Sequence, residues 1–388
     1  MNQKLNQQVT NLEISGIRQF FNRVQQYPEA VQLTLGQPDF PTPEHIKTAA
    51  AEAIVNNETT YTANAGTIEL RKAASAWAEK RYNLTYMADS EIIVTVGASQ
   101  AIDVTMRTIL EPGDEVIVPA PAYPAYEPII KQCGAEVIFV DTRKSGFKLT
   151  KEQLLKHITK KTKAVMLPYP SNPTGVVLSE YELRELHSVL EQEEVFVVAD
   201  EIYSELRYNG KHESIASLPN MKEKTIVING LSKSHSMTGW RIGFLFAHES
   251  VARHLLKVHQ YNVSCASSIS QAAALAALTS GLTDPVNMRT IYNRRRVWLV
   301  KQLQDASIPA VVPEGAFYIF PDISKSGLSS YEFSLKLLSE EKLAVVPGNA
   351  FSSFGEGYIR LSYAYSMSEL EEAVKRLIRF WRKIGGES

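Results

Sequence analysis

The residue that could carry the most demanding chemistry is Lys233, because a desolvated lysine loses its charge and can then act as a nucleophile or base. Lys233 follows an apolar run, and its segment 228–243 reads INGLSKSHSMTGWRIG. The small residues on both sides leave room for a large group joined to the amine. Arg241 lies further along the same segment. A lone lysine at a strand end is usually solvated, so its chemistry depends on its neighbours in the fold.

Other polar or small residues also follow apolar runs. Asp200 ends one run, Asn172 follows a second, and the small residues 97–99 follow a third and open a helical pattern. Taken alone, Asp200 could be a helix N-cap and the Pro/Asn/Gly segment 170–175 only a turn. If the runs are parallel strands, all of these residues share one sheet edge with Lys233, at which such sheets bind ligands. The helix opening at 97–99 could then bind an anion through backbone N–H groups.

The apolar runs are typical of parallel strands covered on both faces, because they are β-branched, continuous and too short for helices. Between them lie helix signals, including the capping-box patterns Thr150 with Gln153 and Ser179 with Glu182. This alternation predicts an α/β fold with a mostly parallel sheet between helices. The predicted strands are 91–96, 115–118, 136–140, 164–167, 195–199 and 225–228.

The composition changes after about residue 282, which predicts a second, smaller α+β domain. A long charged helix begins near Asp284, and the last helix is expected to open at Ser368 with Glu371. The N-terminal helix expected within 10–26 has no strand partner, so we expect it to join this domain or a subunit interface. Short strands are expected at 316–320, 343–346 and 358–362. The predicted domains are a large one at 45–282 and a small one formed by 1–44 and 283–388.

The overall composition excludes several classes of protein. The 388 residues carry a formal net charge of −1, which argues against a nucleic-acid-binding surface or a polybasic membrane anchor. Cys133 and Cys265 lie far apart, which excludes a disulfide framework and a cysteine zinc site and fits a reduced cytoplasm. No apolar stretch is long enough for a membrane span, and no signal-peptide pattern is present. The histidines show no metal-ligand spacing, so we predict no metal site. The cysteine usage, together with the lack of a signal peptide or membrane span, predicts a cytoplasmic protein.

These motifs together resemble the class I/II pyridoxal-phosphate-dependent aminotransferases over essentially the whole chain. The segment 230–243 is long and specific, and three further motifs occur in the family's order and spacing. They are PSNPTG at 170–175, ADEIY at 199–203 and YIRLS at 358–362. The resemblance implies an aspartate aminotransferase-like fold, in which helices sandwich a mostly parallel seven-stranded sheet beside a smaller α+β domain. It also implies a homodimer whose active sites are built from two subunits.

The resemblance assigns a role to each motif residue. Lys233 would be joined covalently to the cofactor aldehyde and would move the proton between the substrate Cα and the cofactor. Asp200 would keep the pyridine nitrogen protonated, and Tyr203 would complete the catalytic set. Tyr203 and Asn172 would bind the phenolate oxygen, Tyr123 would stack on the ring, and Ala98, Ser99, Ser232 and Arg241 would hold the phosphate. Tyr61 would reach the partner subunit's phosphate, and Arg360 would clamp the substrate α-carboxylate with Gly36 and Asn172.

The implied reaction moves an amino group between an amino acid and a keto acid, with glutamate and 2-oxoglutarate as the common pair. The segments 228–247 and 257–270 are similar to those of Bacillus-type N-acetyl-LL-diaminopimelate aminotransferases of lysine biosynthesis. Aspartate and aromatic aminotransferases share much of the pattern and are alternatives, as are cysteine-conjugate β-lyases of the same fold. No second arginine for a distal carboxylate is evident, although Arg18 could line the entrance.

Two interpretations from other classes are weaker. A non-catalytic regulatory protein of this fold usually carries an attached DNA-binding module, and this chain has no basic extension of that kind. A nicotinamide-dependent dehydrogenase would suit a parallel sheet, but its GxGxxG fingerprint is absent.

Overall fold

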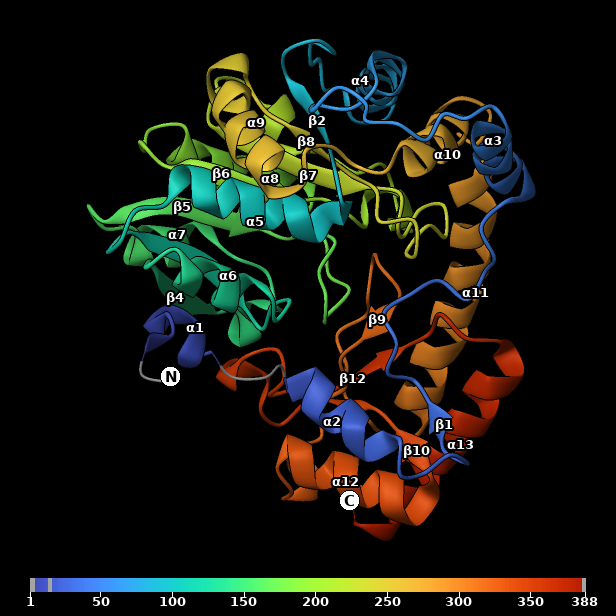
Figure 1. Cartoon of the computed structure of the whole chain (residues 1–388). Helices are drawn as coiled ribbons and strands as arrows, with labels where there is room; N and C mark the ends of the chain where they lie inside the picture. The colour runs from blue at the N-terminus through green and yellow to red at the C-terminus, as the bar shows by residue number, and fades with distance from the viewer. Residues whose placement is uncertain (1–3, 13–15, 386–388) are drawn as a thin grey trace.

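The central element is a seven-stranded sheet with the order β2-β8-β7-β6-β5-β3-β4 (Figure 1). The computed structural model describes residues 4–12 and 16–385, without the side chains of 17–19. Neighbouring strands run parallel except where β8 pairs with β2 and with β7. The predicted fold class is therefore confirmed. The strands are β2 (Ile92–Thr95), β3 (Glu115–Ala120), β4 (Glu136–Asp141), β5 (Thr162–Leu167), β6 (Phe196–Asp200), β7 (Thr225–Gly230) and β8 (Gly243–Phe246).

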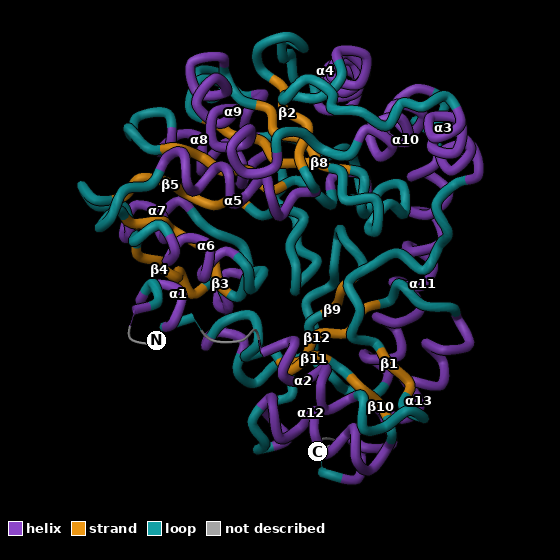
Figure 2. The backbone as a smooth tube through the Cα atoms, viewed as in Figure 1, coloured by secondary structure: helices purple, strands orange, loops and turns teal. Residues whose placement is uncertain are grey.

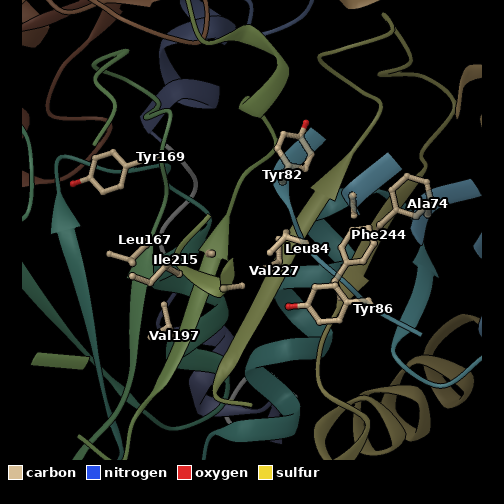
Figure 3. Close-up of a cluster of buried hydrophobic side chains, with 14 of the residues drawn as sticks. Ala74, Tyr82, Leu84, Tyr86, Leu167, Tyr169, Val197, Ile215, Val227 and Phe244 are labelled. Carbon is tan, nitrogen blue, oxygen red and sulfur yellow. The ribbon is translucent and has the colours of Figure 1, made fainter. Parts of the chain in front are cut away.

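Helices cover both faces of this sheet, which explains its continuous apolar strands. Val197 and Ala199 of β6 face one hydrophobic cluster, and Val198 between them faces the other. Figure 3 shows the first cluster, where Val197 and Val227 come from adjacent strands. Its helices are α3 (Glu44–Val55), α4 (Ile68–Tyr82), α7 (Lys151–His157), α8 (Glu180–Leu190) and α10 (Ser268–Thr279). The opposite face packs against α5 (Gly97–Ile109), α6 (Tyr126–Gln132) and α9 (Glu249–Val263).

A separate hydrophobic cluster forms the second, smaller part of the molecule. It contains an antiparallel sheet of order β11-β12-β9 and a parallel pair of β1 and β10. The strands are β1 (Val31–Gln32), β9 (Tyr318–Ile319), β10 (Leu343–Ala344), β11 (Val346–Pro347) and β12 (Ile359–Ser362). The helices are α2 (Gly16–Val24), α11 (Asp284–Asp305), α12 (Ser330–Glu341) and α13 (Met367–Lys383), whereas α1 (Gln7–Thr10) lies beside α6 of the large-sheet part (Figure 1).

Helix α11 connects the two parts, running from the end near α3 and α10 to the small sheets (Figure 1). Loops gather between the large sheet and the small sheets (Figure 2). This arrangement leaves the carboxyl ends of the parallel strands facing the smaller part of the molecule. Among the described residues, no helix is long and apolar enough to cross a membrane.

Candidate active site

A cavity of about 410 Å³ lies at the carboxyl ends of β5, β6 and β7. The large-sheet side contributes the strand-end residues, and the segment 34–37 with residues of β9, β11 and β12 closes the other side. Every site residue predicted from the sequence lines this cavity except Tyr61. They are Gly36, Ala98, Ser99, Tyr123, Asn172, Asp200, Tyr203, Ser232, Lys233, Arg241 and Arg360.

The amine of Lys233 lies inside the cavity, where its Nζ donates a hydrogen bond of 2.5 Å to the carbonyl of Gly36. Its Nζ is 5.9 Å from the ring centres of both Tyr203 and Phe317. Burial lowers the pKa of this amine from 10.5 to about 8, and the charge of Arg360 acts in the same direction. The amine can therefore exchange a proton near neutral pH, as a catalytic base requires.

Asp200 is the last residue of β6 and is 6 % exposed. Its Oδ2 accepts a hydrogen bond of 2.7 Å from the hydroxyl of Tyr126, and its Oδ1 accepts one of 3.3 Å from the Ile202 amide. Burial raises the pKa of this carboxyl, while the Tyr126 hydroxyl opposes the rise. A cationic partner in the cavity would favour the ionised form. Tyr126 was not among the predicted site residues, and its only sequence signal is its place close after Tyr123.

The opposite end of the cavity is suited to an anion. Within the described part of the chain, no side chain caps the N-terminus of α5, so its first N–H groups remain available to a ligand. Gly97 has φ +75°, and a Cβ there would lie 2.6 Å from Nη2 of Arg241. Glycine at this position therefore lets the guanidinium approach the helix N-terminus. Ser99 and Ser232 line the same cavity and add hydroxyl donors.

The guanidinium of Arg360, in β12, is buried under the aromatic rings of Tyr318 and Phe351, at 4.5 and 4.9 Å from their centres. It donates a hydrogen bond of 3.0 Å to Asn172 Oδ1 and one of 2.6 Å to the Thr34 carbonyl. Its Nε is buried and has no hydrogen-bond partner among the residues that the structure describes. A buried cation with an unused donor is suited to a carboxylate.

Tyr318 is a second site residue that the sequence did not reveal. Its hydroxyl shares a hydrogen bond of 2.8 Å with the hydroxyl of Tyr203. A Cβ at Gly36 would collide with the same hydroxyl, so this glycine lets the backbone pass close to the tyrosine. The contact joins β9 to a segment far away in the chain, and therefore no local pattern could predict it.

Tyr61 does not line the cavity, and 87 % of it is exposed on the surface of the single chain. Its predicted role at a partner subunit's site stays a prediction. The side chain of Arg18 lies outside the described residues. Across residues 4–12 and 16–385, no group of three or more His, Cys, Asp or Glu residues could hold a metal ion.

A buried amine and carboxylate beside a helix N-terminus suited to an anion, at the carboxyl edge of such a sheet, are what an aspartate aminotransferase-like site would require. Comparison with known proteins gives the same class. Residues 28–377 match the family model for aminotransferases of class I and II. The chain belongs to this family.

Individual relatives cover nearly the whole chain. A probable N-acetyl-LL-diaminopimelate aminotransferase of Bacillus subtilis is 55% identical over 98% of this chain and 96% of its own length. An aspartate aminotransferase of Pyrococcus abyssi is 40% identical over 95% and 96%. The solved structure of Thermus thermophilus aspartate aminotransferase with maleate has a TM-score of 0.92 and 34% identity, covering 97% of this chain and 99% of that one. The protein is therefore an aminotransferase of class I and II.

Proposed function

We propose that this aminotransferase uses pyridoxal 5'-phosphate and acts on an N-acetylated diaminopimelate in lysine biosynthesis, with glutamate and 2-oxoglutarate as the second pair. The observation that carries the cofactor proposal is the placement of Lys233 and Asp200 in one cavity whose other end suits an anion. The cofactor has an aldehyde, a basic ring nitrogen and a phosphate, and each needs a different partner.

The donor set fits these three groups. Lys233 provides an amine of lowered pKa for the aldehyde, and Asp200 provides a buried carboxylate for the ring nitrogen. The uncapped α5 N-terminus and Arg241 would take the phosphate, helped by Ala98, Ser99 and Ser232. Tyr203 and Asn172 would hydrogen-bond the phenolate oxygen, and Tyr123 would stack on the ring.

When bound, the cofactor supplies an electron sink for the electrons released at the substrate Cα. The residues of this chain do the rest. Asp200 would hold a proton on the ring nitrogen, and the Lys233 amine would carry the proton between the substrate Cα and the cofactor. Arg360 binds the α-carboxylate through its forked guanidinium and so orients the Cα–H bond toward Lys233. The walls formed by the segment 34–37 limit the access of water.

The substrate proposal is supported by the 55% identity to the probable N-acetyl-LL-diaminopimelate aminotransferase. Aspartate is the second candidate, because the aspartate aminotransferase of Pyrococcus abyssi is 40% identical to this chain over almost its whole length. The cavity itself is walled by apolar side chains toward α2, including Phe20 and Phe21, and by Ile102 and Val346. These side chains favour a substrate with an aliphatic stem beyond the Cα.

The proposal includes a homodimer in which Tyr61 of each chain reaches the partner subunit's cofactor phosphate. Tyr61 is 87 % exposed in the single chain, so its side chain is free to contact a second subunit. It also includes a cytoplasmic location, supported by the free thiols of Cys133 and Cys265.

Reduction with borohydride tests the cofactor proposal. We expect the purified protein to be yellow and a single pyridoxyl adduct to form on Lys233 after reduction, as peptide mass spectrometry can establish. An adduct on another lysine, or none, would contradict the proposal.

A screen of amino donors with 2-oxoglutarate tests the substrate. Acetylated diaminopimelate should give the highest kcat/KM, and a preference for aspartate would select the second candidate.

A further inference from the structure

The segment 34–39 lies on the path from β1 to α3 (Figure 1), and its residues 34–37 line the cavity. Its backbone contacts two of the proposed site residues. The carbonyl of Thr34 accepts a hydrogen bond of 2.6 Å from Arg360, and the carbonyl of Gly36 accepts one of 2.5 Å from Lys233. The position of this segment therefore determines the direction of the Lys233 amine and of the Arg360 guanidinium.

The segment belongs to no helix or strand, so its own backbone does not fix its position. Leu35 is held by one hydrogen bond of 3.1 Å from its amide to the Tyr365 hydroxyl. Further along the chain, the Thr42 hydroxyl donates a hydrogen bond of 2.7 Å to the Ser236 carbonyl within the lysine motif. Between these two points the strongest attachment is an ion pair.

That ion pair joins Asp39 to Arg295 of α11. Two parallel hydrogen bonds of 2.8 Å run from Nη1 and Nη2 of the guanidinium to the two carboxylate oxygens. The Arg295 side chain is 8 % exposed and lies 5.5 Å from the ring centres of Phe40 and Tyr292. A forked pair of this kind fixes direction as well as distance, and the surrounding rings prevent the guanidinium from moving aside.

We propose that Asp39 and Arg295 are a positioning pair for transamination, which holds the segment 34–39 so that its carbonyl groups orient Arg360 and the free amine of Lys233. Neither Asp39 nor Arg295 lines the cavity. It acts through Gly36, three residues before Asp39, whenever the lysine amine is not engaged by the cofactor. This inference rests on the proposed function of Lys233.

The test compares Arg295→Lys, which keeps the charge but loses the fork, with Asp39→Asn, which keeps the shape but loses the charge. Lys301→Gln is the matched control, because it removes an exposed ion pair with Asp305 from the same helix. The half-reaction of each holoenzyme with an amino donor is followed in a single turnover. An α-deuterated donor then shows how far proton transfer limits the rate.

Both variants should slow the half-reaction by roughly tenfold to hundredfold, since a small displacement of a catalytic group has effects of that size. The deuterium isotope effect should rise, because a misplaced amine makes proton transfer slower. Asp39→Asn serves as the second variant if Arg295→Lys does not fold. The control should match the wild type. Rates and isotope effects equal to those of the control in both variants would overturn the proposal.

A second measurement needs no catalysis. In the apoprotein, the pH dependence of Lys233 reductive methylation gives the titration midpoint of its amine. The Gly36 carbonyl stabilises the charged ammonium, so loss of this acceptor should move the midpoint of Arg295→Lys below that of the wild type. An unchanged midpoint would contradict the positioning role. If wild-type protein transfers no amino group at all, the proposed function fails, whereas this shift still reports on the pair.

Discussion

The chemistry of the cavity follows from the burial of the Lys233 amine and from the signs of the charges beside it. Burial and the charges of Arg360 and Arg241 favour its neutral form, whereas the carboxylate of Asp200 favours the charged form. With a pKa of about 8, a minor fraction of the amine is neutral at pH 7, and the neutral amine is the form that can attack an aldehyde or accept a proton. The same carboxylate has its own pKa raised by burial. Each group therefore needs a partner that the cofactor would provide.

The substitution Asp200→Asn separates charge from shape at this position. The asparagine would keep an oxygen for the Tyr126 hydroxyl but would not hold a proton on the ring nitrogen. We expect kcat to fall by roughly 10²–10⁴, the range found for positioned acids and bases. Thermal stability of the apoprotein should not fall, because the substitution removes a buried charge whose cationic partner would come only with the cofactor. Tyr126→Phe is the control, since it removes one hydrogen bond of 2.7 Å and keeps the carboxylate.

The kinetics of these two variants should differ clearly. Tyr126→Phe should lose less, roughly tenfold to hundredfold, which corresponds to a single hydrogen bond to a charged group. Equal losses in both variants would mean that Asp200 matters through its contacts rather than its charge. Unfolding of Asp200→Asn with unchanged specific activity would mean that Asp200 serves the fold, through the hydrogen bonds it accepts from Tyr126 and Ile202, and not the chemistry.

The sequence predicted the residues with distinctive motifs but not those that support them. Lys233, Asp200 and Arg360 each stand in a recognisable pattern and line one cavity. Tyr318 and Arg295 act through contacts with residues more than a hundred positions away. Such contacts depend on how two domains meet, and a single sequence carries no local signal for that.

At the scale of elements, the N-terminus of α5 allows a direct test of the phosphate site. Gly97→Ala would place a Cβ 2.6 Å from the Arg241 guanidinium in a backbone conformation of φ +75°. The affinity for the cofactor should fall about tenfold or more, equivalent to about 1.4 kcal/mol, because the guanidinium must move away from the helix. Equilibrium titration of the apoprotein with the cofactor measures this change.

Gly113→Ala is the matched control, because it has φ +91° and no described atom lies within 4 Å of the added Cβ. Both substitutions impose the strain of an alanine in the left-handed region, which costs roughly 1–2 kcal/mol of stability. Only the first meets a functional side chain. If both variants bind the cofactor equally well, Arg241 does not depend on this glycine.

The elements themselves were largely predictable. All the expected strands of the large sheet formed, and the capping boxes at Thr150 and Ser179 are present. The predicted start of the last helix was wrong by two residues: the N-cap is Ser366, paired with Glu369, and not Ser368, paired with Glu371. Both pairs satisfy the same capping pattern. The choice between them depends on where the chain leaves β12, which the local sequence does not encode.

At the scale of the whole molecule, α11 is the only described helix that spans both the large-sheet side and the small sheets (Figure 1). Its buried Arg295 and Arg296 donate hydrogen bonds to Asp39 and to the Pro313 carbonyl. The predicted boundary near residue 282 falls at the start of this helix. The boundary itself stays a prediction.

The proposed dimer can be tested by mixing two inactive variants. Lys233→Ala lacks the catalytic amine, and Tyr61→Ala lacks the tyrosine that we propose for the partner subunit's phosphate. In a mixed dimer, one site combines the intact lysine of one chain with the intact tyrosine of the other. Random reassembly should therefore restore roughly a quarter of the wild-type activity, since half of the molecules are mixed and each has one complete site. Native mass spectrometry measures the fraction of mixed dimers in the same sample.

The control is a mixture of Lys233→Ala with Asp200→Asn, whose defects both lie in the chain's own cavity. In this mixed dimer each chain carries its own damaged site, so no complete site forms. The activity should stay near the summed residual activities of the two variants measured alone. Recovery in the first mixture alone would place Tyr61 at the partner's site. Failure of the first mixture, with mixed dimers present, would show that Tyr61 acts in its own chain or not at all. Because 87 % of Tyr61 is exposed in one chain, an action within its own chain would also require a movement of the loop that carries it.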